Sequence, residues 1–102
     1  MSAIVHDIKC WPKFFSDVWK GYKRVEWRIN DRRYTVGDTL HMREWDPETK
    51  TYSGRWLDVP VDGVLDAMTY FGPGFGEGMV LLRLVMGKMV RSDTVDVGES
   101  TP

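Results

Sequence analysis

The stretch PKFFSDVWKGYKRVEWRI, residues 12–29, decides the fold because its periodicity changes at Gly21. Before this glycine the large apolar side chains recur at one-and-four spacing, which is typical of a helical face, and Pro12 suits a helix's first turn. After it, the side chains alternate with a period of two, as they do in a strand. Gly21 itself is a typical C-terminal helix stop. The sequence therefore predicts a helix over 12–20 and a strand over 22–29.

The predicted strand has one apolar face and one charged face. Its alternating positions are, on one side, Val25, Trp27 and Ile29 and, on the other, Arg24, Glu26 and Arg28. Because large rings dominate burial, we assign three aromatic residues to the core, namely Phe14, Phe15 and Trp27. Three others are candidates for the wall of a cleft, namely Trp45, Trp56 and Tyr70.

Strand signals lie on both sides of this stretch. Runs rich in β-branched and aromatic residues, separated by glycine, proline and asparagine turns, are typical of short strands. The remaining expected strands cover residues 3–9, 39–45, 51–59, 61–68 (bent or bulged) and 79–86, with a brief extended piece over 34–36 and a glycine-rich loop over 70–78. A helix near the front of five to six strands predicts an α+β domain with a small, strongly curved sheet or a barrel.

Length and composition exclude several classes of protein. With 102 residues the chain fits one domain, and its single cysteine, Cys10, cannot form an internal disulfide. The apolar runs are shorter than the roughly 20 residues needed to cross a bilayer, and the first residues lack a secretory signal pattern. We expect one cytoplasmic domain over 1–90 without a membrane partner, followed by an acidic, mobile tail over 91–102.

The net charge of −1 averages over a basic segment. Residues 20–33 hold six of the 14 basic residues and two acidic ones, Glu26 and Asp31. Such a patch attracts phosphate and releases counterions on binding, although a solvated charged strand face is the alternative. Glu26 can orient neighbouring guanidinium groups, and the interleaved aromatic rings offer surfaces for base stacking.

Metal and nucleophile motifs are missing from the sequence. His6 and His41 lie far apart, and Cys10 has no Cys-x-x-Cys partner, so no zinc ligand set can be recognised. The loop over 70–78 lacks the lysine and hydroxyl residue of a phosphate-binding loop. We expect neither a metal nor a cofactor, and we interpret the loop as a flexible lid or a plain hairpin connection.

Gly21, Lys23, Glu26 and Arg28 resemble the Gly-x-Lys-x-x-Glu-x-Arg signature of ASCH domains, a branch of the PUA-like superfamily. The similarity covers roughly residues 5–86, and its other segments are 6–9, 30–40, 44–47 and 52–55. Together they look like a small subfamily of bacteria and their phages. The resemblance implies a PUA-like mixed β-barrel with one helix after the first strand, in a bacterial cell or a phage-infected host.

ASCH domains are proposed to bind RNA, so the resemblance implies a cleft lined by Lys23, Glu26 and Arg28. Our leading hypothesis is a binding module for nucleic acid, RNA above all, or for a modified nucleotide. Its partner would be RNA, DNA or a nucleotide. The candidate ligand-binding residues are Lys23, Arg24, Glu26, Arg28, Arg32, Arg33, Trp45 and Arg55. In a regular strand Lys23 would face away from Glu26, unless the chain is irregular just after Gly21.

Two alternatives stay open. One ASCH branch is similar to an amidohydrolase of acetylated cytidine, and another is a ribonuclease; an enzyme of this kind would use Lys23 and Glu26 as its acid/base pair. Glu26 stands where the amidohydrolase has a nucleophilic threonine, and Glu44 and Glu77 are candidates for its distant glutamate. The other alternative is a phage or bacterial interaction protein whose exposed aromatic residues dock on another protein.

Overall fold

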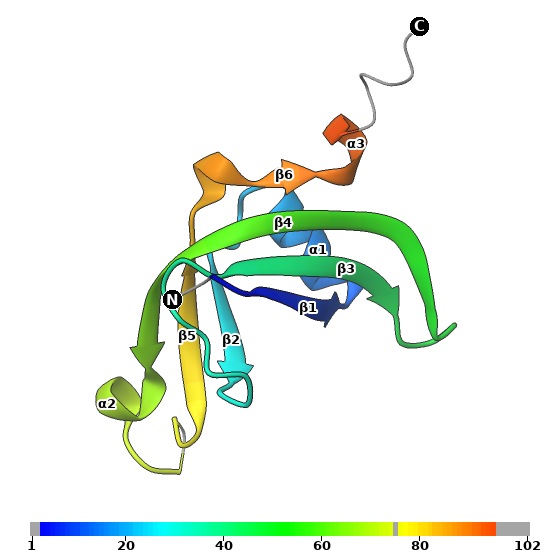
Figure 1. Cartoon of the computed structure of the whole chain (residues 1–102). Coiled ribbons are helices and arrows are strands. Elements are labelled where there is room, and N and C mark those ends of the chain that lie inside the picture. Colours follow the sequence, from blue (N-terminus) through cyan, green and yellow to red (C-terminus); the bar gives the residue numbers. More distant parts are fainter. Residues whose placement is uncertain (1–2, 75, 96–102) are drawn as a thin grey trace, which may run out of the picture.

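The structure, a computed structural model, describes residues 3–74 and 76–95. Its elements are β1 (Val5–Cys10), α1 (Pro12–Trp19), β2 (Val25–Ile29), β3 (Thr39–Asp46), β4 (Thr51–Asp66), α2 (Ala67–Phe71), β5 (Met79–Leu84), a short 3₁₀ helix (Met86–Lys88), β6 (Val90–Arg91) and α3 (Ser92–Val95) (Figure 1). Within these ranges, none of the helices is both long and apolar enough to span a membrane. The expected α+β class is confirmed.

The strands form one mixed sheet in the order β1-β3-β4-β5-β2, with β6 beside β4. β1 and β3 are parallel, and the other neighbours are antiparallel. β4 pairs with β3 up to Pro60 and with β5 from Val61, where a register shift before Gly63 bends the strand. At Gly63 an added Cβ would lie 3.2 Å from the Cβ of Arg83, so the close approach of the two strands at this bulge favours a residue without a side chain. The sheet therefore curls along β4 (Figure 1).

The predicted barrel is not confirmed, because the curled sheet stays open between its two end strands. In the described part of the chain, β1 and β2 pair with β3 and β5 but not with each other. Arg32, just after β2, donates from Nη1 to the backbone oxygen of Asp7 in β1 at 2.7 Å. The side chain of Arg32 thus hydrogen-bonds a backbone oxygen of β1 that, in a closed barrel, would accept from the backbone of a neighbouring strand.

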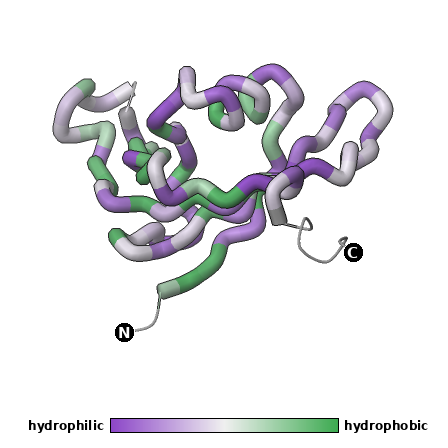
Figure 2. The backbone as a smooth tube through the Cα atoms, turned by 90° about the horizontal axis from the view of Figure 1, so that it is seen from above, coloured by the Kyte–Doolittle hydropathy of each residue, from purple (hydrophilic) through white to green (hydrophobic). Residues whose placement is uncertain are grey.

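The core lies between α1 and the inner face of the sheet, and α1 packs against β3. Buried residues alternate with exposed ones along β1 and with half-buried ones along β3, which is the period expected of strands with one covered face. Figure 2 shows hydrophobic and hydrophilic residues mixed along the whole backbone. The largest fully buried side chains are Phe15, Ile8, Leu40, Met42, Leu57, Leu82, Val18, Val59 and Val61.

Most of the predicted elements are present, with shifts in three places. The expected helix and the strands over 3–9, 39–45 and 79–86 correspond to α1, β1, β3 and β5. The two strands expected on either side of Pro60 are a single strand, because this residue lies where β4 changes partners. Residues 34–36 form no strand. α2 replaces the end of the strand expected over 61–68 and the first two residues of the loop expected over 70–78, and its start is capped by Asp66, whose Oδ1 accepts from the backbone nitrogen of Met68.

The C-terminal segment that the structure describes is attached to β4. β6 pairs with residues 57–58, and the hydroxyl of Ser92 accepts a hydrogen bond from the backbone nitrogen of Trp56 at 3.1 Å. Arg91 donates to the backbone oxygen of Trp19 at 3.3 Å. Residues 91–95 of the expected tail are therefore held on the domain, and residues 96–102 lie outside the described residues.

A buried carboxylate joins the start of β1 to the start of β3. Asp38 Oδ2 accepts from His6 Nε2 at 2.8 Å and from the Thr35 nitrogen at 3.0 Å, and Oδ1 accepts from the Ile4 nitrogen at 3.1 Å. Burial alone would raise the pKa of Asp38, but these hydrogen bonds outweigh it, and the pKa lies below the ordinary value of 3.8.

Asp38→Asn should destabilise the protein at pH 7 by about 2 kcal/mol, because buried donors lose part of their acceptor. A lowered pKa stabilises the folded state above pH 3.8, and this contribution is lost as the pH falls through the folded pKa. The variant should therefore show a shallower loss of stability in acid, measured by urea unfolding from pH 7 to pH 3. Asp62→Asn, on an exposed carboxylate of β4, is the control. If the free energy of unfolding fell equally steeply with decreasing pH in Asp38→Asn and in the parent protein, this role of Asp38 would be contradicted.

Candidate functional site

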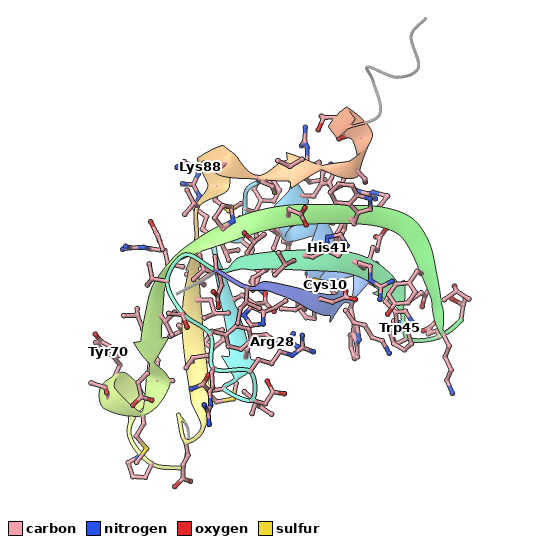
Figure 3. The ribbon with its side chains drawn as sticks, viewed as in Figure 1. Cys10, Arg28, His41, Trp45, Tyr70 and Lys88 are labelled. Atoms are coloured by element: carbon pink, nitrogen blue, oxygen red, sulfur yellow. The ribbon has the colours of Figure 1, made fainter. Side chains whose placement is uncertain are left out.

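The two end strands of the open sheet border a cavity of about 220 Å³, which we call the β1–β2 cavity. β1 and β2 supply its sides, and α1 and the turn after α1 supply the rest. Its lining residues are Lys9, Cys10, Trp11, Phe14, Lys23, Glu26 and Arg28. In Figure 3, Arg28 and Cys10 lie on the two strands that flank the gap, whereas Tyr70 lies at the far end of the molecule on α2.

Glu26 is a charged residue buried inside the cavity wall, with 5% of its surface exposed. It is paired with Leu82 of β5 and so lies on the inner, core-facing side of the sheet. Its Oε1 accepts from Lys23 Nζ at 2.8 Å, and its Oε2 accepts from Arg28 Nη1 at 3.4 Å. A buried carboxylate is costly unless it is paired, so these two cations are what the position requires.

Lys23 reaches Glu26 because the backbone is irregular after Gly21. This glycine has a φ of +85°, a left-handed conformation that favours glycine, and β2 begins only at Val25. The backbone nitrogen of Lys23 donates to Asp17 of α1, at 3.0 Å. Lys23 therefore belongs to the turn and not to the strand, and its side chain shares the side of Glu26 despite the odd spacing.

The aromatic wall of the cavity differs from our prediction. Phe14 was expected in the core but is 44% exposed, and its ring stacks near Trp11, 53% exposed, with centroids 6.4 Å apart. Phe15, the next residue, is fully buried as predicted. Neighbouring helical residues are about 100° apart, so only one of them can face the core directly.

Trp27 was also expected in the core, and this prediction was wrong. The strand turns its charged side inward, so Trp27 lies on the outer face together with Val25 and Ile29, which are exposed. Its ring is half-buried, 5.5 Å from the ring of Phe71 in α2. Period-two alternation separates the two faces of a strand but does not say which of them the fold covers.

A second cavity of about 340 Å³, which we call the outer cavity, shares Lys9 and Arg28 with the first. Its lining residues are Asp7, Lys9, Arg28, Arg32, Arg43 and Tyr52. Of the predicted ligand-binding residues, the structure thus gathers Lys23, Glu26 and Arg28 in one cavity and Arg32 in the adjoining one. Trp45 lies beside them, with its ring centroid 4.4 Å from Lys9 Nζ.

The other predicted binding residues lie elsewhere. Arg24 turns back to the carbonyl oxygen of Gly21, and Arg33 lies in a turn with a φ of +51°. Arg55 covers the rings of α1, with its Cζ 4.3 Å from the Trp19 centroid. None of these three arginines lines either cavity in the described structure.

Two of the predicted cleft aromatics are likewise remote from the cavities. Trp56 lies against the His41 ring, at 5.3 Å between centroids, and Tyr70 is exposed on α2. Several residues that line the cavities were not predicted from the sequence to do so, namely Lys9, Trp11, Phe14, Arg43 and Tyr52. The sequence did carry a local signal for Trp11. It directly precedes the proline that begins the helix, so its ring must lie at the N-terminal end of that helix. Lys9, Arg43 and Tyr52 come together only through sheet pairing, since they lie on β1, β3 and β4.

Cys10 contributes an unreactive thiol to the cavity wall. Burial is the main cause that raises the pKa of Cys10 to about 12, and the negative charge of Glu26 adds to it, while Lys23 and Arg28 act in the opposite direction. The thiolate is the reactive form of cysteine. At neutral pH Cys10 is therefore no candidate nucleophile, and the polar chemistry of the cavity belongs to Lys23, Glu26 and Arg28.

The structure thus defines an α+β domain with an open sheet and a charged cavity at the gap between its end strands, β1 and β2, which we call the seam. The model of one family, the domain of unknown function DUF3850, matches residues 5–84, and the chain belongs to this family. The chain is 33% identical over 90 residues to an uncharacterized 12.9 kDa protein in the GpA 3′ region of Escherichia phage P2. The alignment covers 88% of this chain and 76% of that protein. The matched residues include the whole lining of the β1–β2 cavity. The expected kinship with a small phage and bacterial family is confirmed.

The folded protein should resist alkylation at Cys10. A pKa of about 12 in place of 9.0 lowers the thiolate fraction at pH 8 roughly 1000-fold, so iodoacetamide should react at least about 100-fold more slowly than with the urea-unfolded chain. Glu26→Gln should speed the reaction, because it removes the charge that raises the pKa, whereas Asp62→Asn should not. Mass spectrometry follows the modification. Equal rates for the folded and the unfolded protein would contradict a raised pKa of Cys10 in the folded state.

Proposed function

We propose that this chain is an ASCH-type binding module that takes a nucleotide of a nucleic-acid strand, RNA above all, into the β1–β2 cavity. The observation that carries the proposal is Glu26, buried and hydrogen-bonded to Lys23 and Arg28, in the wall of an open cavity. Burying the Glu26 carboxylate beside two half-buried cations has a stability cost in a domain this small. A ligand that uses all three groups accounts for their place at an accessible seam instead of in the core.

The groups of the cavity match the parts of a nucleotide. Carboxylate oxygens accept hydrogen bonds from the amino and imino groups of a base edge, as the carboxylate of Glu26 can. The exposed rings of Trp11 and Phe14 offer stacking surfaces, each worth about 1–3 kcal/mol per base. Lys23, Arg28 and Lys9 supply positive charge for phosphate at the same cavity.

Short single-stranded RNA and DNA should bind at low salt, and the affinity should fall steeply as salt is raised. Lys23→Gln and Arg28→Gln each remove a charge but keep a donor for Glu26, and each should weaken binding about tenfold or more. Fluorescence anisotropy between 20 and 200 mM salt measures the effect. Arg83→Gln is the matched control, because Arg83 lies on the outer face of β5 and pairs with Asp62. Undetectable binding at low salt, or equal affinities in all variants, would exclude the proposal.

A hydrolase is the second candidate, favoured by the 2.8 Å hydrogen bond between Lys23 Nζ and Glu26 Oε1 inside the cavity. Such a pair can move a proton to and from a reacting group. Because Glu26 replaces the nucleophilic threonine of the similar amidohydrolase, water would be the attacking group. If the protein is an enzyme, it should turn over acetylated cytidine or an RNA strand, and Glu26→Gln should abolish turnover with an unchanged circular dichroism spectrum. Binding without any turnover would leave the binding module as the function.

The interaction-protein hypothesis rests on a different surface. The outer side of β2 and α2 exposes Ile29, Tyr70 and Phe71. A protein bound there would survive high salt and nuclease treatment and would be insensitive to Lys23→Gln. Nucleic-acid binding has the opposite signature on both counts, so the same variants separate the two hypotheses.

A further inference from the structure

The outer cavity is strongly cationic. Its wall holds four basic side chains, Lys9, Arg28, Arg32 and Arg43, against one carboxylate, Asp7. That carboxylate is already paired, since Arg43 donates to Asp7 from Nε at 2.9 Å and from Nη2 at 3.2 Å. The cavity therefore carries an excess of positive charge that no carboxylate in its own lining balances.

Several of these side chains are held in place before any ligand arrives. Arg43 Nη2 also donates to the hydroxyl of Tyr52 at 3.0 Å, and its Cζ lies 4.0 Å from the centroid of that ring. Arg32 is tied to the backbone oxygen of Asp7 at 2.7 Å. Guanidinium groups fixed in this way lose little conformational entropy when they bind an anion.

The two cavities adjoin across the open seam of the sheet. Glu26 lies on the inner face, whereas Asp7, Lys9 and Arg43 lie on the outward side of β1 and β3, opposite the buried positions. Lys9 and Arg28 line both cavities, one from each flanking strand. The path from one cavity to the other thus passes between β1 and β2, where the sheet does not close.

We propose that the outer cavity is a phosphate subsite for the nucleotide next to the one held in the β1–β2 cavity. The inference rests on the proposed function and narrows its ligand. The ligand is a strand that carries a base on the inner side of the seam and at least one further phosphate on the outer side, not a free nucleoside. Arginine is suited to this role because its guanidinium carries five donors. Arg43 uses Nε and Nη2 on Asp7 and Tyr52, and Arg32 uses Nη1 on the Asp7 backbone, so further donors remain for phosphate oxygens.

A series of RNA ligands tests the subsite: a nucleoside, its 5′-monophosphate, and 5′-phosphorylated single strands of two and four nucleotides. The parent protein should gain about tenfold in affinity when the strand supplies the second phosphate. Arg32→Gln and Arg43→Gln should remove that gain but leave the affinity for the monophosphate unchanged. Lys9→Gln should weaken both classes of ligand, since Lys9 lines both cavities. Each lost phosphate contact should also reduce, by about one, the slope of the logarithm of strand affinity against the logarithm of salt concentration.

Arg83→Gln is again the control, and urea unfolding checks that every variant keeps its fold. Arg32 is the safer of the two test positions, because it is exposed and its contact is with a backbone oxygen. The subsite proposal is overturned if strand length adds no affinity, or if both arginine variants keep the full gain. In those cases the monophosphate still binds through Lys23 and Arg28. If no ligand binds at low salt, the proposed function itself fails.

Discussion

A single long strand holds the two halves of this sheet together. β4 pairs first with β3 and then, past a bulge at Val61–Gly63, with β5. Because one strand serves both halves, the bend at the bulge turns β2 and β5 toward β1 and β3. The resulting curl brings the end strands close without hydrogen-bonding them to each other. Every feature of the candidate site follows from that unpaired seam.

At the seam, side chains occupy the place of a strand ladder. Arg32 takes a backbone acceptor of β1, and Lys23 and Arg28 hold the carboxylate of Glu26. Closing the sheet would bury these charges further, at a cost that ion pairing does not always recover. The open seam and the charged trio are therefore consistent with each other: the charges need water or a ligand, and the gap gives them access to both.

The same seam connects two chemically different surfaces. On its inner side a carboxylate, three cations and two aromatic rings surround a small cavity, and on its outer side arginines predominate. Recognition of a base requires directional acceptors and flat surfaces, whereas recognition of a phosphate requires charge. A polymer in which every unit carries both a base and a phosphate meets both requirements at once. The family match over residues 5–84 covers this whole region.

The sequence by itself determined most of the local elements, because helix and strand periods, the glycine stop at Gly21 and the turns are set by neighbouring residues. It also indicated Lys23, Glu26 and Arg28 as a group, through a motif within one short segment. Only the tertiary structure decided which side of β2 is covered, and so placed Trp27 outside and Glu26 inside. It alone brought Lys9 and Arg43 beside Arg28, since these residues come from three separate strands. Alternation is a property of one strand, whereas burial and cavity lining depend on which strands pair and where the sheet remains open.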